Sequence, residues 1–165
     1  MKKQRICKIA VGAIILVGIL FDQLTKYLAV EYLRPIGSFP LWKDVLHLTY
    51  AENRGAAFGM LADNRWVFMW VSTIALSVLL VYFYFFAKRY TYLGSVALGM
   101  IVSGGIGNMI DRIALGYVID FIDFTLINFA IFNFADSIVC VGAGLLVLSI
   151  LLEPQKKEPK DDSSL

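Results

Sequence analysis

Two carboxylates in the second half of the chain are placed where a proton-sharing pair could form. Asp120 lies in VIDFID (118–123), and Asp136 lies in IFNFADS (131–137), directly before a long uncharged run. Two carboxylates close enough to share a proton cannot both ionise easily, so one proton stays on the pair near neutral pH. One member then acts as a base toward water and the other as an acid toward a carbonyl. This chemistry hydrolyses a peptide bond without a metal ion or a nucleophilic serine or cysteine. The sequence leaves open which member carries the proton, because the pair titrates as one unit.

Other polar residues interrupt or end strongly apolar segments, where ionisable side chains are costly and become candidates for function. Three groups stand out: Asp22 with Lys26, Asn108 with Asp111 and Arg112, and Asn133 with Asp136. Asp111 and Arg112 also have a structural interpretation as an ion pair at a membrane interface.

The remaining groups have structural interpretations too. Asp22 and Lys26, four residues apart, would pair on one face of a helix. Asn133 would cap a helix, and Asp136 would be favoured in its first turn by the helix dipole. The glycines of SGGIG (103–107) would let membrane helices approach closely.

His47 is the only histidine, and Cys7 and Cys140 are the only cysteines. We interpret His47 as a loop residue and the two thiols as packing residues, since their surroundings suggest neither a disulfide framework, a metal site nor a nucleophile.

The elements that must position these residues are membrane helices. Of 165 residues, 59% are hydrophobic and 17% are charged, against about a quarter charged in soluble domains; the mean hydropathy is +0.72. A span needs about 20 mostly apolar residues, and four segments qualify: 9–30, 66–86, 92–111 and 134–152. The first is a retained span, because no small-x-small cleavage site follows it. We expect a single membrane domain over 1–152 and a disordered cytoplasmic tail over 153–165.

Basic residues orient the spans. Nine flank the side that holds both termini and five flank the other, which predicts both termini in the cytoplasm. All the polar groups then lie at the outer face. The long outer loops, 31–65 and 112–133, are rich in β-branched and aromatic residues and predict short strands or an amphipathic surface segment.

Five motifs together resemble the bacterial lipoprotein signal peptidases, or signal peptidase II. They are FDQLTK (21–26), ENRGAAFG (52–59), GGIGNMIDR (104–112), VIDFID (118–123) and FNFADS (132–137), in the family's order and on a four-span chain. The resemblance implies an all-α membrane protein of four spans, with an outer β-rich cradle and a small surface helix from the two outer loops.

The resemblance also implies an activity: an aspartic endopeptidase of the bacterial cytoplasmic (inner) membrane. It would cut signal peptides from prolipoproteins before a diacylglyceryl-modified cysteine. By motif, the catalytic pair is Asp120 and Asp136, whereas Asp123 is not part of it. The positions that line or support the site are Asp22, Lys26, Asn53, Gly55, Asn108, Arg112, Asn133 and Ala135. We expect a monomer in contact with membrane lipid, with no cofactor, metal or nucleic acid. Ala130 stands where the family often has proline, which bears on the rigidity of that loop.

Two other functions are compatible with intramembrane charges. In a proton- or ion-coupled transporter, Asp22, Lys26, Asp111 and Arg112 would form a relay; these groups gather at one face, however, rather than tracing a path across the bilayer. The second alternative, a non-catalytic membrane scaffold, does not explain why the carboxylates converge at one face.

Overall fold

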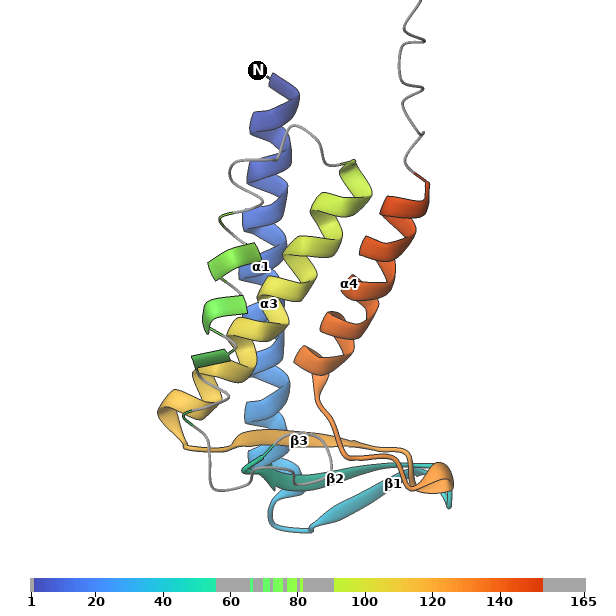
Figure 1. Cartoon of the computed structure of the whole chain (residues 1–165). Coiled ribbons are helices and arrows are strands. Elements are labelled where there is room, and N and C mark those ends of the chain that lie inside the picture. Colours follow the sequence, from blue (N-terminus) through green and yellow to red (C-terminus); the bar gives the residue numbers. More distant parts are fainter. Residues whose placement is uncertain are drawn as a thin grey trace, which may run out of the picture.

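Three long helices stand side by side in a computed structural model of the chain (Figure 1). The structure describes residues 2–55 and 91–152, with isolated positions between 66 and 81. The helices are α1 (Lys2–Leu28), α3 (Tyr92–Ala114) and α4 (Phe134–Leu151), and α1 continues as a π-helical turn, Ala29–Leu33. Each is long and apolar enough to cross a membrane. The first, third and fourth predicted spans are thereby confirmed as helices.

Two other predictions fall outside this part of the chain. Most of the predicted second span, 66–86, and the tail, 153–165, lie outside the described residues.

A three-stranded antiparallel sheet lies across one end of the helices, which we call the sheet end (Figure 1). Its strands, in the order β1-β2-β3, are β1 (Ser38–Trp42), β2 (Leu46–Asn53) and β3 (Val118–Asp123). They come from the two predicted outer loops, so the predicted strands are confirmed, and a purely helical description of the chain is too narrow. Of the predicted surface helix, the described residues contain one short 3-10 turn, η3 (Thr125–Ile127).

Helix α3 lies between α1 and α4 and contacts both (Figure 1). Most of its buried residues are glycine, alanine or serine, and small residues of this kind allow membrane helices to approach closely. A side chain at Gly104 would overlap the Ala135 carbonyl of α4, and one at Gly107 would overlap the Asp22 carboxylate of α1. These glycines therefore let polar groups of three helices meet at the sheet end.

The chain returns from β3 to α4 through a short backbone pairing. Phe132 pairs with Ile122, its N–H donating to the Ile122 carbonyl at 3.1 Å and its carbonyl accepting from Ile122 N at 2.8 Å. Helix α4 begins two residues later, at Phe134. This pairing holds the first turn of α4 against the sheet.

Candidate active site

Asp120 is a buried residue of β3 whose two carboxylate oxygens each accept an amide hydrogen bond. Asn133 Nδ2 donates to its Oδ1 at 2.7 Å, and Asn53 Nδ2 donates to its Oδ2 at 2.9 Å. Asn53 ends β2, and the Gly55 N–H fixes the orientation of its amide by donating to Asn53 Oδ1 at 3.0 Å.

Asp136 lies in the first turn of α4, in a reciprocal cap with Asn133. The Asp136 N–H donates to Asn133 Oδ1 at 2.9 Å, and the Asn133 N–H donates to Asp136 Oδ2 at 3.1 Å. The second oxygen, Oδ1, accepts from Asn108 Nδ2 at 2.8 Å. The helix-cap interpretation is therefore confirmed, and it does not compete with a role for Asp136, because the cap fixes the carboxylate in place.

Asn133 joins the two carboxylates. Its side-chain oxygen caps Asp136 N–H, while its Nδ2 donates to Asp120 and, at 3.0 Å, to Asn108 Oδ1. One buried amide thus contacts β3, α3 and α4 at once. Asp120 and Asp136 consequently belong to one hydrogen-bond network.

A buried ion cluster supports this network from the helix side. Lys26 Nζ lies 2.9 Å from Asp22 Oδ2, 2.9 Å from Asp111 Oδ2 and 2.9 Å from Asn108 Oδ1. With its oxygen held by Lys26, the Asn108 amide must turn its Nδ2 toward Asp136. Asp22 Oδ1 in turn accepts the Ala135 N–H of α4 at 3.1 Å.

The ion cluster corrects one sequence interpretation and extends another. The predicted Asp22–Lys26 pair is confirmed, but it is the core of a larger cluster rather than a neutralised pair. Asp111, which the sequence paired with its neighbour Arg112, forms its ion pair with Lys26 across the helix interface and accepts Ile119 N–H at 3.1 Å. Arg112 acts electrostatically on Asp136, Asp120 and Asp111.

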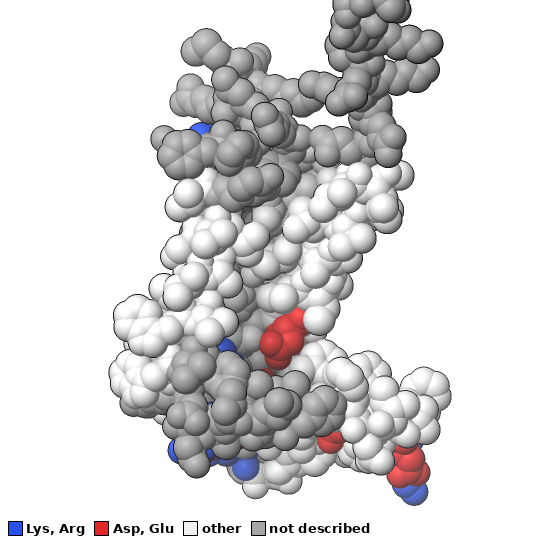
Figure 2. All heavy atoms as spheres, viewed as in Figure 1, with Lys and Arg blue, Asp and Glu red and all other residues white. Residues whose placement is uncertain are grey.

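A cavity of about 450 Å³ opens beside both carboxyl groups. Its polar lining is Asn53, Gly55, Arg112, Asp120, Asp136 and Ser137, and its apolar lining is residues 129–132 with Cys140. Figure 2 shows acidic atoms in the hollow between α4 and the sheet. The cavity can therefore hold a peptide bond against two carboxyl groups and a guanidinium, with an apolar wall beside it.

Burial raises the pKa of Asp120 to about 6. The hydrogen bond from Asn53 opposes this shift, the negative charge of Asp136 adds to it, and the bond from Asn133 and the charge of Lys26 oppose it. The Asp120 carboxyl therefore keeps its proton to a higher pH than an exposed aspartate, which suits a residue that supplies a proton.

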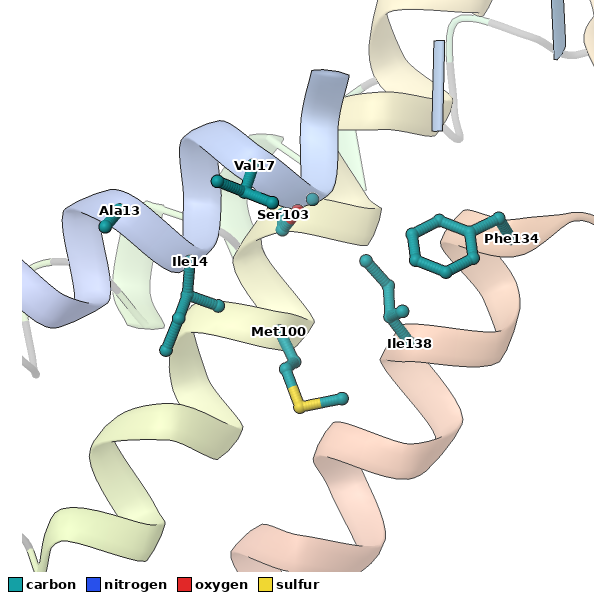
Figure 3. A pocket seen from close by; sticks show the side chains of 8 residues that line it. Ala13, Ile14, Val17, Met100, Ser103, Phe134 and Ile138 are labelled. Atoms are coloured by element: carbon teal, nitrogen blue, oxygen red, sulfur yellow. The ribbon is translucent and has the colours of Figure 1, made fainter. Parts of the chain in front are cut away.

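A second cavity, of about 360 Å³, lies between α1, α3 and α4 on the other side of α4 (Figure 3). Its walls are apolar side chains such as Val17, Met100 and Ile138, and its hydroxyl, Ser103 Oγ, donates to the Ile15 carbonyl at 3.3 Å. Among the described residues no titratable group lines it. The chemistry therefore belongs to the cavity at the sheet end.

All ten residues singled out by motif lie in this region. Asp22, Lys26, Asn108, Asn133 and Ala135 form the supporting network, and Asn53, Gly55 and Arg112 line the cavity with the two aspartates. Asp123 lies outside it, accepting a hydrogen bond from Thr49 Oγ1 at 2.9 Å.

Sequence reasoning gave no site role to Gln23 or Cys140. It singled out Asp111, but not as a partner of Lys26. Gln23 Nε2 lies 3.1 Å from Asp111 Oδ1 and 3.2 Å from Asp22 Oδ2, between the two carboxylates. Cys140, interpreted from the sequence only as a packing residue, is exposed and lines the cavity.

Residues 14–152 match the family described as signal peptidase (SPase) II. The chain belongs to the signal peptidase II family. A lipoprotein signal peptidase of Caldanaerobacter subterraneus subsp. tengcongensis is 50% identical over 136 residues, covering 81% of this chain and 92% of the relative. One of Halothermothrix orenii is 44% identical over 135 residues, covering 82% of this chain and 90% of the relative.

Solved structures agree with this assignment. A bacterial membrane enzyme solved by the in meso method is 34% identical, with a TM-score of 0.76, and the match covers 92% of this chain and 94% of that one. The chain is therefore a membrane enzyme of an aspartic peptidase family, as the five motifs predicted.

Proposed function

We propose that this enzyme removes the signal peptide from diacylglyceryl-modified prolipoproteins, cutting before the lipidated cysteine, with Asp120 and Asp136 as its catalytic pair. The observation that carries the proposal is the pair of carboxyls joined through Asn133 in the wall of one cavity. The names of the relatives supply the class of substrate.

The surroundings of the two carboxyls support different roles. Asp136 accepts hydrogen bonds from N–H groups of Asn108 and Asn133 and lies at a helix N-terminus, where the dipole favours negative charge, so it is assigned the role of base. Burial raises the pKa of Asp120 to about 6, so it takes up a proton more readily than an exposed aspartate and is assigned the role of acid.

Hydrolysis follows from these roles in two steps. Asp136 takes a proton from a water molecule, and the oxygen of that water adds to the carbon of the scissile carbonyl. At the same time Asp120 gives its proton to the carbonyl oxygen. The tetrahedral intermediate then collapses: the C–N bond breaks, Asp136 returns a proton to the leaving amine, and Asp120 recovers its proton from the hydroxyl. Arg112 and Asn53 line the cavity where they can hold the substrate backbone by charge-assisted and amide hydrogen bonds.

We further propose a single domain of four membrane spans, acting as a monomer in the cytoplasmic membrane with both termini in the cytoplasm and the sheet outside. The distribution of basic residues supports this orientation. The catalytic pair then lies at the outer edge of the bilayer, where the acyl chains of a substrate stay in lipid while its peptide bond meets water.

The test is processing of a diacylglyceryl-prolipoprotein in liposomes by the variants Asp120→Asn and Asp136→Asn. Each should lose at least about 100-fold in kcat, in line with the contribution of a positioned acid or base. Asp123→Asn is the matched control on the same strand and should keep most of the activity. Thermal unfolding checks that each variant is folded. Near-normal turnover by either dyad variant would make the assignment wrong.

A further inference from the structure

The end of the sheet farthest from the helices carries large apolar side chains that are exposed as fully as those on the outer faces of the helices. Leu41 and Trp42 end β1, and Leu126 and Ile127 belong to η3; they are 55%, 69%, 67% and 66% exposed. We call these four residues the sheet tip. In a water-soluble loop, side chains of this size would be expected to fold inward.

The two halves of the sheet tip are held together by the backbone. The Leu126 N–H donates to the Val45 carbonyl at 3.4 Å, and the Val45 N–H donates to the Trp42 carbonyl at 3.0 Å. The apolar side chains therefore come from two turns fixed against each other rather than from one mobile loop. Figure 2 shows this end as largely uncharged, with acidic and basic atoms at its lower edge, away from the helices.

The depth of the sheet tip follows from α4. This helix has 18 residues, or ~27 Å at about 1.5 Å per residue, close to the hydrocarbon thickness of about 30 Å. The sheet is paired with Phe132, two residues before the helix begins. The sheet thus lies in the headgroup layer, the depth at which tryptophan and other aromatic side chains are favoured.

We infer that the sheet tip is an anchor that inserts into the interfacial layer of the outer leaflet and holds the mouth of the catalytic cavity against the lipid. This inference rests on the proposed orientation and deepens the proposed function. A row of rings connects the two places: Phe124 stacks on Phe132 at 5.9 Å, and Phe132 contacts Phe129 at 5.9 Å. Phe129 and Phe132 line the cavity. The apolar wall of the cavity therefore continues toward the anchored surface, and an acyl chain can follow it without crossing water.

Position-specific quenching in liposomes tests the anchor without requiring activity. A polarity-sensitive fluorophore is attached at Ile127→Cys in the full chain with Cys7 and Cys140 replaced by serine. The label should be quenched by phospholipids carrying a nitroxide near the headgroup and protected from iodide in the outer solution. The matched control is Lys43→Cys, one residue beyond Trp42 and itself exposed, which should show the reverse pattern.

Two results would overturn the inference. Equal iodide quenching at both positions, without quenching by lipid, would place the sheet tip in water. Protection of the label from both quenchers, with cross-linking to a second chain, would assign the surface to a protein partner.

The double variant Leu126→Ser with Ile127→Ser adds a functional readout: the KM for the lipidated substrate in liposomes should rise several-fold with kcat little changed. A loss of kcat in Asp120→Asn together with water-exposed labels would reject the anchor and leave the proposed function standing.

Discussion

At the scale of single residues, Asp120 and Asp136 are distinguished by their surroundings rather than by their chemistry. Asp120 is buried in a strand and has a pKa raised to about 6, whereas Asp136 occupies the first turn of a helix and is partly exposed. Both are held by side-chain amides, which fix their oxygens without adding charge. Pairs of carboxyl groups that lie in different surroundings are typical of acid–base catalysis.

The pH dependence of cleavage should report the proton on Asp120. That carboxyl is protonated and competent as an acid below its pKa, so kcat/KM should fall as the pH rises through the upper apparent pKa of the pair. Asn53→Ala removes a hydrogen bond that lowers the pKa of Asp120. The pKa should therefore rise, and the alkaline limb of the pH–rate profile should move to higher pH. Thr49→Val, which removes the corresponding bond to Asp123, should leave the limb where it is. A limb shifted to lower pH by Asn53→Ala would contradict this assignment.

The ion cluster around Lys26 makes a second prediction at this scale. Lys26→Met leaves the Asp22 and Asp111 carboxylates buried without their cation. Breaking a buried pair in this way costs about 3–5 kcal/mol, so the free energy of unfolding in detergent should fall by that order. Adding Asp111→Asn should recover part of the loss, because one uncompensated charge is removed. Lys43→Met at the exposed hairpin is the control and should change stability little; a similar loss there would show that the effect is not specific to the cluster.

At the scale of elements, α3 positions the site because it has glycine where it meets α4 and α1. Gly104 and Gly107 let α3 approach α4 and α1, and this approach brings Asn108 and Asp111 to Asp136 and Lys26. The precision of the dyad therefore depends on helix contacts as much as on the residues that touch substrate.

Gly104→Ala should lower both stability and activity. The added methyl would overlap the Ala135 carbonyl and lie 2.7 Å from Val139 Cγ2, so the first turn of α4 must shift and carry Asp136 with it. Overpacking of this kind costs about 1–3 kcal/mol. Gly144→Ala in α4 is a matched control, because nothing lies within 4 Å of an added methyl; it should be neutral or slightly stabilising, as alanine favours helices. Thermal unfolding and turnover in detergent measure both effects.

The elements also show which parts of the site were predictable from the sequence. The helices and the polar residues of the site were predictable, because an apolar medium penalises polar groups and each polar residue in an apolar segment is therefore conspicuous. The partner of Asp111 was not, since the choice between adjacent Arg112 and distant Lys26 depends on how α1 and α3 are rotated against each other. The exposure of Cys140 was also not predictable, because it depends on which face of α4 is turned away from α3.

At the scale of the whole molecule, the polar network and the apolar surfaces of the helices are separated along the length of the helices. Charged and amide groups of three helices meet the sheet at one end (Figure 1), while the helices beyond them are apolar in composition and present uncharged surface (Figure 2). In the proposed function, a substrate anchored in the bilayer is brought to the level of the cavity by its own acyl chains.

This division predicts a strong dependence on lipidation of the substrate. A diacylglyceryl group buries many methylenes, each contributing about 0.8 kcal/mol to membrane binding, so the lipidated precursor is concentrated at the depth of the cavity and its cysteine is held near Asp120 and Asp136. With enzyme and precursor in liposomes, kcat/KM for the lipidated form should exceed that for the unlipidated form by at least about 100-fold, the equivalent of about 2.7 kcal/mol. Mixed micelles in which both precursors are equally incorporated are the control, and there the difference should shrink to what the contacts of the cavity supply. Equal cleavage of both precursors in liposomes would mean that the peptide sequence alone recruits the substrate, and the membrane would then have no part in recognition.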